Sequence, residues 1–229
     1  MQTVVYIADT APLQDEKVFA ALYQVLPAYR RQKIDRYTVA DGKRLSLGVG
    51  ALLKLACRDQ GIPGADNNII FGEQGKGYFQ TVPDAFFNLS HSGERAMCVL
   101  SPVETGCDVQ QIQKIRWPVA RRVFSTEEQN WLKKQELCGR GDEAFTRLWA
   151  LKESYLKAVG KGFSAAPEGI SLSVFNEIVT VENQEEPQNY VFFEPNLEDD
   201  YRYACCLKNA PSGTEISVRQ CDLTLPQFL

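Results

Sequence analysis

The sequence has little of what zinc sites and disulfide frameworks require. Its 229 residues include a single histidine, His91, and its seven cysteines form no Cys-x-x-Cys pair. A zinc site is therefore not expected, because such sites gather several Cys or His ligands. The cysteine count is odd, and apolar runs such as Met97-Cys98-Val99 are typical of small buried thiols. This usage predicts free cysteines in a reducing compartment.

Long apolar runs and a basic balance are also missing. No stretch approaches the roughly 18 apolar residues that a membrane span needs. The opening segment MQTVVYIADT has neither the basic start nor the apolar core of a signal peptide. We therefore predict a cytoplasmic protein with no membrane contact. The net charge of −4 argues against general nucleic-acid binding, because that function favours basic surfaces.

The length suits two small domains that share an interface. The chain is 44% hydrophobic and 24% charged, which is the composition of a globular protein. A short polar joint at 102–106 predicts a boundary there. We expect an N-terminal half at residues 1–103 and a C-terminal half at residues 104–229.

Strand and helix patterns occur in both halves. In the first half, strands are expected at 2–8 and within 85–101, and Asp41 is placed to cap a helix that ends near Asp59. In the second half, TGCDVQQI reads as a strand, and Ser125 with Glu128 forms a capping-box pattern at the start of a helix. The remainder of the chain is rich in β-branched and aromatic residues, which favours strands.

A helix predicted over 145–159 carries charged groups on and beside its apolar face. Lys152 lies within the apolar stripe, while Glu153 and Lys157, four residues apart, lie along its edge. A Glu–Lys pair at this spacing is often only a surface ion pair. Lys152 could extend its ammonium to the edge of the core, or it could point into a polar cleft. The spacing alone leaves these alternatives open.

Two other polar residues stand in unusual surroundings. Asp108 lies inside an apolar strand, where a carboxylate requires a partner or a metal because a bare buried charge is costly. The alternative is an Asp at a strand end that bonds to a turn. His91 follows Ser90 in a predicted polar turn, where small polar residues and an imidazole could bind phosphate. The alternative is a structural histidine.

Basic residues gather in the first half. One segment carries several of them: Arg30, Arg31, Lys33, Arg36 and Arg44. Lys76 stands between two glycines, which would let the backbone and an ammonium approach a phosphate together. A solvated charged face is the alternative. Together with two carboxylates for a hard cation, these groups predict a site for Mg²⁺ and a diphosphate.

The spacing of these motifs resembles a known family. GCDVQQ, followed about forty residues later by LWALKESYLKAVGKG, is similar to the paired signature of the 4′-phosphopantetheinyl transferases, of the larger surfactin-synthetase-activating type. FNLSHSGERAMCVLS, EQGKG and GKRLSLG resemble that type in the same order. The resemblance implies an α/β (α+β) protein with two similar halves in a pseudo-twofold arrangement. It also implies a monomer that binds coenzyme A in the cleft between the halves.

The resemblance further implies roles for individual residues. Asp108 and Glu153 match metal ligands, and Lys157 matches a lysine at the reacting phosphate. Matches to coenzyme A phosphate contacts fall on Arg44, Lys76, Ser90, His91 and Lys152. Glu128 matches a further acidic position near the metal. Gln110 stands where many relatives have Glu, so Gln110 or a water would complete the Mg²⁺ site.

The implied reaction moves 4′-phosphopantetheine from coenzyme A to a serine of an acyl or peptidyl carrier protein and releases 3′,5′-ADP. We expect Asp108, Glu153 and Lys157 to be catalytic, with Glu153 or a base it orients removing the serine proton. The basic region 114–124 is expected to dock the acidic carrier. Two alternatives are kept: a metal-dependent nuclease, and a non-catalytic protein that binds coenzyme A or the carrier. A small trimeric carrier-protein synthase is disfavoured, because one chain is long enough to supply both halves.

Overall fold

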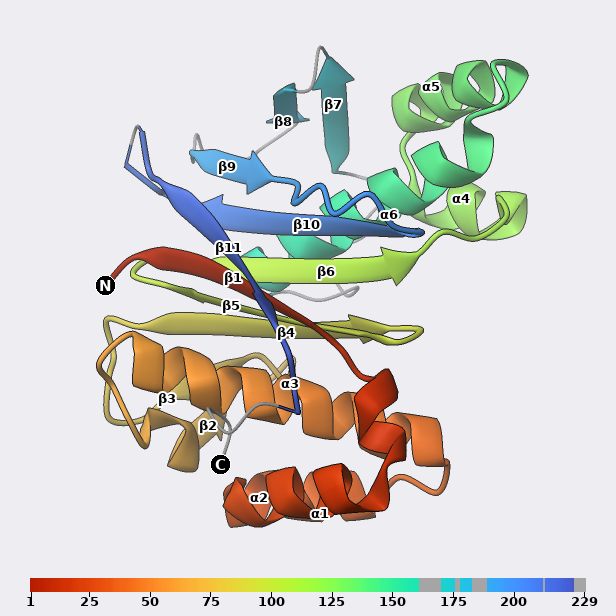
Figure 1. Cartoon of the computed structure of the whole chain (residues 1–229). Helices are drawn as coiled ribbons and strands as arrows, with labels where there is room; N and C mark the ends of the chain where they lie inside the picture. The colour runs from red at the N-terminus through yellow and green to blue at the C-terminus, as the bar shows by residue number, and fades with distance from the viewer. Residues whose placement is uncertain (161–169, 176–177, 183–188, 212, 225–229) are drawn as a thin grey trace. The chain divides into compact units, whose positions relative to one another are not determined.

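The structure, a computed structural model, describes residues 1–160, 170–175, 178–182, 189–211 and 213–224 (Figure 1). It divides into two compact units. The first consists of Met1–Val103 with Gly213–Leu229, and the second of Glu104–Ser212.

The expected assignment of residues 104–229 to one half is therefore wrong at its C-terminal end. Strand β11 (Ile216–Cys221) belongs to the first unit, where it pairs in parallel with β1 (Thr3–Asp9). Pairing between strands so far apart in the sequence leaves no local pattern from which it could be predicted.

The first unit is built on a four-stranded sheet with the order β11-β1-β5-β4. Strand β5 (Arg95–Ser101) is antiparallel to both β1 and β4 (Phe86–Ser92). The long helix α3 (Ala40–Asp59) packs on β1, β4 and β5. The remaining elements are α1 (Glu16–Val25), α2 (Ala28–Asp35), the 3₁₀ helices η1 (Ala11–Gln14) and η2 (Ala65–Asn67), and the hairpin of β2 (Ile69–Phe71) and β3 (Gly77–Phe79).

The second unit is built on a three-stranded antiparallel sheet with the order β6-β10-β9. Its long helix α6 (Gly141–Val159) packs on β6 and β10, and α5 packs against α6. The other bounds are β6 (Thr105–Gln111), α4 (Trp117–Val123), α5 (Thr126–Leu137), β7 (Ser171–Phe175), β8 (Ile178–Glu182), β9 (Tyr190–Phe193) and β10 (Tyr201–Lys208). The end of the glycine motif, residues 161–162, lies outside the described residues.

The two units repeat one order of elements. Each begins with a strand, continues with two shorter helices and one long helix, then has a two-stranded hairpin, and closes with two antiparallel strands. In each sheet the last of these strands lies between the other two, as β1-β5-β4 and β6-β10-β9. The expectation of two similar α+β halves is therefore confirmed, although the sequence shows no strong internal repeat.

Local signals explain the start of α5 and the end of α6. The predicted capping box is present at α5, where Ser125 accepts from the Glu128 amide and the Glu128 carboxylate accepts from the Ser125 amide. Gly160 ends α6 in the left-handed region, with φ of 76°. The prediction that Asp41 caps α3 is wrong, because the helix already begins at Ala40 and Asp41 instead pairs with Arg44 one turn on. In the described part of the chain, no helix is long and apolar enough to cross a membrane.

Candidate active site

Strand β6 and helix α6 meet at very short range at Gly106. A Cβ atom built on Gly106 would lie 2.1 Å from the Ser154 carbonyl oxygen and 2.3 Å from the Ala158 amide nitrogen. Side chains do not approach backbone atoms this closely, so only glycine fits here. As a result, Asp108, two residues further along β6, lies beside the C-terminal part of α6.

Asp108 is the centre of a small polar cluster. Its side chain is 2% exposed. Lys157 donates from Nζ to Asp108 Oδ1 at 2.6 Å and to the Cys107 carbonyl oxygen at 3.1 Å, while Gln110 donates from Nε2 to Asp108 Oδ2 at 2.9 Å. The buried carboxylate is thus paired with a cation and hydrogen-bonded, as such groups require. The alternative of an Asp that only bonds to a turn does not hold.

The pKa values of the α6 groups follow from this packing. Burial raises the pKa of Glu153 to about 7; the nearby Asp108 charge raises it further and Lys157 opposes the shift. Burial alone would lower the pKa of Lys157, but Asp108, Cys107 and Glu153 outweigh that effect and raise it. Lys157 is therefore a fixed cation, and Glu153 is a carboxyl group that can exchange a proton near neutral pH.

The cluster offers a limited set of oxygen ligands for the metal that the motifs imply. Among the described residues, no three His, Cys, Asp or Glu side chains gather closely enough to hold a metal ion. Asp108 and Glu153 nevertheless supply two carboxylates, Gln110 supplies an amide, and Asp108 already binds a cation in the form of the Lys157 ammonium. Mg²⁺ keeps several waters and shares substrate phosphate oxygens, so two carboxylates suffice for it. The residues fit Mg²⁺ in this way.

Lys152 lies elsewhere. Its side chain is 1% exposed and points away from this cluster to Glu128, also 1% exposed, at 2.5 Å from Nζ to Oε2. Lys152 also donates to the Val123 carbonyl oxygen at 3.0 Å. The structure thus pairs Lys152 with Glu128 in the interior, where the sequence predicted a coenzyme A phosphate contact for Lys152 and a position near the metal for Glu128. Because α6 is covered by β6, β10 and α5, a residue inside its apolar stripe faces another helix rather than solvent.

The remaining predicted phosphate contacts all lie in the first unit. Ser90 and His91 are part of β4 itself rather than of a turn, with Ser90 buried and His91 exposed. Lys76 stands at the end of the turn before β3, is 9% exposed and lies 5.8 Å above the Tyr78 ring. Arg44 is on α3, and no described group accepts a hydrogen bond from its buried Nε. Helix α3 and strand β3 both contact β4, so one unit brings these elements together.

The first unit also has a hollow of about 460 Å³ that the motifs did not identify as a site. It is lined by Tyr29, Gln32, Lys33, Arg36, Tyr37 and Phe71. Lys33 and Arg36 belong to the basic segment seen in the sequence, and burial lowers the pKa of Lys33, with Arg30 adding to the effect. The sequence signal for this hollow is the alternation of aromatic and basic residues along α2, a combination that suits a base and a phosphate.

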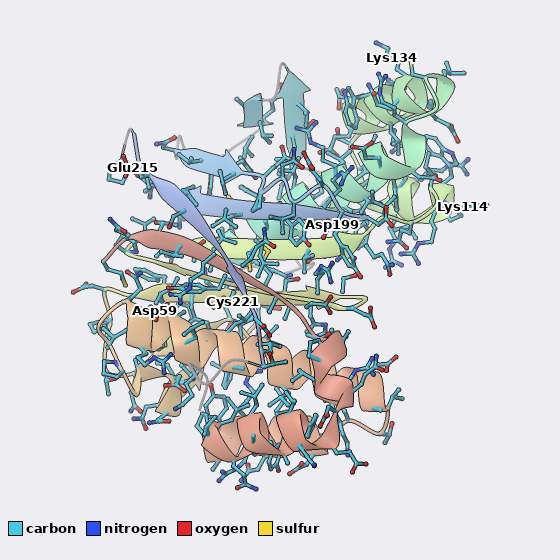
Figure 2. The ribbon with its side chains drawn as sticks, in the orientation of Figure 1. Asp59, Lys114, Lys134, Asp199, Glu215 and Cys221 are labelled. Atoms are coloured by element: carbon cyan, nitrogen blue, oxygen red, sulfur yellow. The ribbon has the colours of Figure 1, made fainter. Side chains whose placement is uncertain are left out.

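The surface around α4 is basic. Lys114, Arg116, Arg121 and Arg122 are exposed, and Figure 2 shows Lys114 and Lys134 extending outward from this part of the second unit. Few apolar side chains are exposed beside them. Val123 and Phe124 are 7% and 1% exposed and belong to the core, which leaves the half-buried Trp117.

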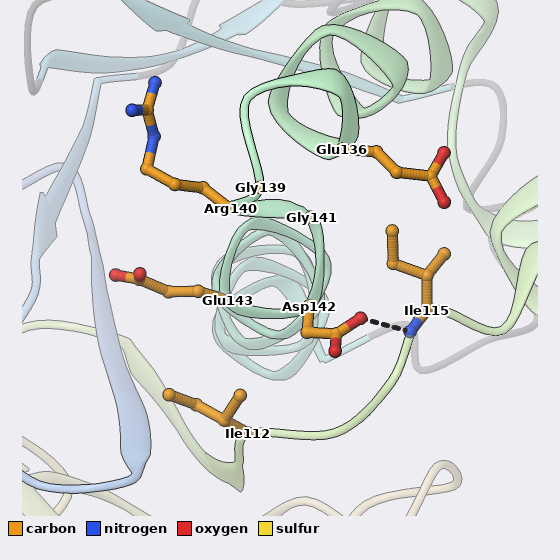
Figure 3. A pocket seen from close by; sticks show the side chains of 8 residues that line it. All are labelled: Ile112, Ile115, Glu136, Gly139, Arg140, Gly141, Asp142 and Glu143. Carbon is orange, nitrogen blue, oxygen red and sulfur yellow. Dashed lines mark hydrogen bonds between the residues drawn. The ribbon is translucent and has the colours of Figure 1, made fainter.

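A second hollow, of about 400 Å³, lies where α6 begins (Figure 3). Its acidic groups already have partners. Asp142 accepts from the Ile115 amide at 3.0 Å, Glu143 pairs with Arg202 at 2.6 Å, and Glu136 accepts from the Trp117 indole at 3.3 Å. The first of these contacts holds the segment between β6 and α4 against the start of α6.

A buried carboxylate paired with a lysine, together with a second carboxyl group whose pKa is about 7, defines a candidate phosphoryl-transfer centre in the second unit. Comparisons with known proteins agree. The family model of the 4′-phosphopantetheinyl transferase superfamily matches residues 104–206, which include Asp108, Glu153 and Lys157.

Several relatives match over most of the chain. The 4′-phosphopantetheinyl transferase gsp of Aneurinibacillus migulanus is 31% identical over 197 residues, which cover 84% of this chain and 80% of the relative. The 4′-phosphopantetheinyl transferase Sfp of Bacillus subtilis strain 168 is 26% identical over 208 residues, 90% of this chain and 92% of the relative. A solved holo-(acyl-carrier-protein) synthase from Bacillus anthracis in complex with CoA (3′,5′-ADP) is 21% identical over 47% of this chain and 97% of its own, with a TM-score of 0.38.

The chain therefore belongs to the 4′-phosphopantetheinyl transferases, a family of enzymes. The family resemblance read from the sequence motifs is confirmed.

Proposed function

We propose that this enzyme transfers the 4′-phosphopantetheine group of coenzyme A to a serine of an apo acyl or peptidyl carrier protein. In this reaction the serine oxygen bonds to the phosphorus of the phosphopantetheine, the diphosphate bond breaks, and 3′,5′-ADP leaves. The observation that carries the proposal is the Asp108–Lys157 pair with Glu153 beside it, at the place where the Gly106 contact brings β6 against α6.

Each group of the cluster has a role in the proposal. Glu153, or a base that it orients, accepts the serine proton. Lys157 binds the reacting diphosphate and stabilises the charge on the leaving 3′,5′-ADP, because its raised pKa keeps it cationic. Asp108 orients Lys157 through the 2.6 Å contact.

Mg²⁺ is part of the proposal as the cation that Asp108 and Glu153 would hold, with Gln110 or a water beside them. When bound, it neutralises charge on the diphosphate. The coenzyme A phosphates are assigned to Arg44, Lys76, Ser90 and His91. The unpartnered Nε of Arg44 supports its assignment, and we place its contact near the 3′-phosphate.

The carrier is proposed to dock on the exposed basic groups of 114–124. Carrier proteins are usually acidic, and the chain as a whole has a net charge of −4, so a local basic surface is needed for association. We further propose a monomer in the cytoplasm that binds neither nucleic acid nor membrane. The seven cysteines, all free in the structure, support a reducing compartment.

Mass spectrometry tests the proposal directly. Several apo-carriers are incubated with the enzyme, coenzyme A and Mg²⁺, and we expect a mass increase of one phosphopantetheine on the acceptor serine, lost with EDTA and with Glu153→Gln. Binding of coenzyme A without any holo-carrier would favour a non-catalytic binding protein. Cleavage of plasmid DNA with Mg²⁺, in a parallel tube, would favour a nuclease.

A further inference from the structure

The ion pair between Glu128 and Lys152 connects more of the second unit than a capping box needs. Glu128 Oε2 accepts from Lys152 Nζ at 2.5 Å and from the Ser125 amide at 2.7 Å, and Glu128 Oε1 accepts from the Leu172 amide at 2.8 Å. Lys152 adds the contact to the Val123 carbonyl oxygen and lies 5.6 Å above the Phe124 ring. The pair therefore joins the end of α4, the start of α5, helix α6 and strand β7.

Stability alone does not explain a pair of this kind. Moving two charges into the interior costs free energy that their attraction only offsets, and well-packed apolar residues are often equally stable. Burial raises the pKa of Glu128, although Lys152 and the Leu172 and Ser125 amides oppose the shift. The pair instead fixes how the segments around it are placed, because its hydrogen bonds to three backbone groups set both the distance and the direction of each segment.

The two ends of this connection are informative. At one end is Val123, the last residue of α4, which directly follows the exposed Arg121 and Arg122. At the other end is Lys152, which directly precedes Glu153 on α6. Adjacent residues of a helix point in different directions. Within one turn of α6, Lys152 therefore hydrogen-bonds to Val123 at the end of α4, and Glu153 lies near Asp108.

We propose that Glu128 and Lys152 are positioning residues that hold the carrier-docking helix α4 in register with the transfer groups of α6. The inference rests on the proposed function, because it concerns where the carrier serine arrives relative to Glu153. A docking segment that shifts by about 1 Å is enough to lower a transfer rate by orders of magnitude. The pair touches no reacting atom in this proposal.

The test removes both charges and keeps the volume. In the double variant Lys152→Met/Glu128→Gln, the amide still accepts one backbone hydrogen bond and no charge is left buried alone. We expect a folded protein in which kcat/KM for the apo-carrier falls about tenfold or more, while the KM for coenzyme A stays unchanged. Hydrogen exchange should become faster in α4 while α6 stays protected. Lys152→Arg, which keeps the cation, should recover part of the loss.

The matched control is another ion pair of α6. Arg147 pairs with Glu194 through two contacts of 2.6 and 2.7 Å, does not reach α4 through that pair, and has no role in the site. Arg147→Met/Glu194→Gln should lower thermal stability and leave kcat/KM for the carrier unchanged. Equal losses in the two double variants would show that Lys152 and Glu128 act only on stability.

The outcomes separate the inference from the proposed function. If the wild type makes no holo-carrier, the proposed function fails. If the wild type is active and the folded double variant keeps its carrier kcat/KM, the positioning role is wrong. Should the double variant fail to fold, Glu128→Asp takes its place, because it keeps both charges and shortens one side chain by a methylene; unchanged carrier kinetics there would equally overturn the inference.

Discussion

The two long helices, α3 and α6, occupy the same place in the order of their units and differ in what they carry. Both pack on antiparallel strands, and they have 20 and 19 residues. Their C-cap residues are Gln60 and Gly160, so each residue of α3 matches the residue of α6 numbered one hundred higher. The positions of Lys152, Glu153 and Lys157 are thereby those of three buried residues of α3: Leu52, Leu53 and Cys57.

The same architecture therefore has a structural role at these positions in one unit and a proposed chemical role in the other. In the first unit the matching positions complete an apolar core. In the second unit the same positions hold an internal ion pair and the proposed transfer groups. Burying the two lysines costs free energy, and in the second unit Asp108 and Glu128 offset that cost as their ion-pair partners. The predictions below test that division.

The largest effect is expected at the contact between α6 and its sheet. Gly106→Ala places a Cβ against the backbone of Ser154 and Ala158, which cannot move without displacing the helix. We expect a loss of about 4 kcal/mol or more in the free energy of unfolding, or no folded protein. Urea unfolding followed by circular dichroism measures it.

The matched substitution in the first unit is Gly50→Ala on α3. The added Cβ there would meet side-chain carbons of Arg30 and Leu26 at 3.0 Å, and these can give way. Alanine also gains about 1 kcal/mol of helix propensity over glycine. The net change should stay within about 1 kcal/mol. A Gly106→Ala protein as stable as Gly50→Ala would mean that the α6 contact does not require glycine.

The next effect concerns catalysis. Glu153→Gln keeps the size of the side chain and removes the proposed base and metal ligand, so transfer to the carrier should fall by about 10²–10³ with the fold intact. Leu53→Ala, at the matching position of α3, should cost about 2–5 kcal/mol of stability while the protein that remains folded keeps its kcat. Single-turnover assays on folded protein distinguish the two. Normal transfer by Glu153→Gln would contradict the assigned mechanism.

Features of the fold and the site could be predicted from the sequence where their signal lies in neighbouring residues. The capping box at Ser125, the apolar stripe of α6 and the Gly-x-Asp motif are local, and the structure agrees with them. The position of β11 and the direction of Lys152 depend on contacts with distant segments. The spacing showed that Lys152 lay inside an apolar stripe, but only the packing of α4 and α5 on α6 shows that its ammonium is buried there.

A smaller effect links the same residue to stability and pH. The folded pKa of Glu153, about 7, is raised above its ordinary value of 4.5. At low pH Glu153 is protonated and costs the fold nothing. As the pH rises from about 4.5 through 7, the free energy of unfolding falls, because the folded protein must ionise this desolvated carboxyl group. In EDTA and without coenzyme A, Glu153→Gln should be more stable than the wild type at pH 8, by on the order of 2 kcal/mol. At pH 4.5 the two should be equal.

Thermal unfolding at the two pH values measures this difference. Leu53→Gln serves as the comparison in α3, and it should destabilise at both pH values, since it buries an amide in an apolar core. A Glu153→Gln protein that gains nothing at pH 8 would mean that Glu153 is not held in a desolvated place.

A still smaller effect is expected on the exposed surface of α4. Arg121→Glu/Arg122→Glu should raise the KM for an acidic carrier by about tenfold at low salt and flatten its salt dependence, because rim charges act mainly on association. The KM for coenzyme A should not change. The control in the first unit is Arg31→Glu on α2, which should leave the KM for the carrier unaltered. Arg30 is unsuitable as a control because it is only 5% exposed. An unchanged KM in the α4 variant would move the dock elsewhere.

The smallest effect on turnover is expected at Gln110. Its amide now donates to Asp108 at 2.9 Å, so Gln110→Glu replaces a hydrogen bond with two like charges at short range. Without metal, this should cost the fold about 1 kcal/mol. With metal, the added carboxylate is a further anionic ligand. In the wild type, Asp108 and Glu153 are the proposed anionic ligands, and Lys157 already pairs with Asp108, so the bare enzyme should hold Mg²⁺ weakly.

Coenzyme A then has a measurable influence on the metal. Its diphosphate supplies the missing negative oxygens, so Mg²⁺ and coenzyme A should each tighten the other by the same factor. Gln110→Glu should strengthen Mg²⁺ binding to the free enzyme and reduce that factor, with kcat within a few-fold of the wild type because a carboxylate can replace a water. Calorimetry of Mg²⁺ with and without coenzyme A, on both proteins, measures the coupling. Tight Mg²⁺ binding to the free wild type, unaltered by Gln110→Glu, would place this residue outside the coordination sphere and leave its hydrogen bond to Asp108 as its only contribution to the site.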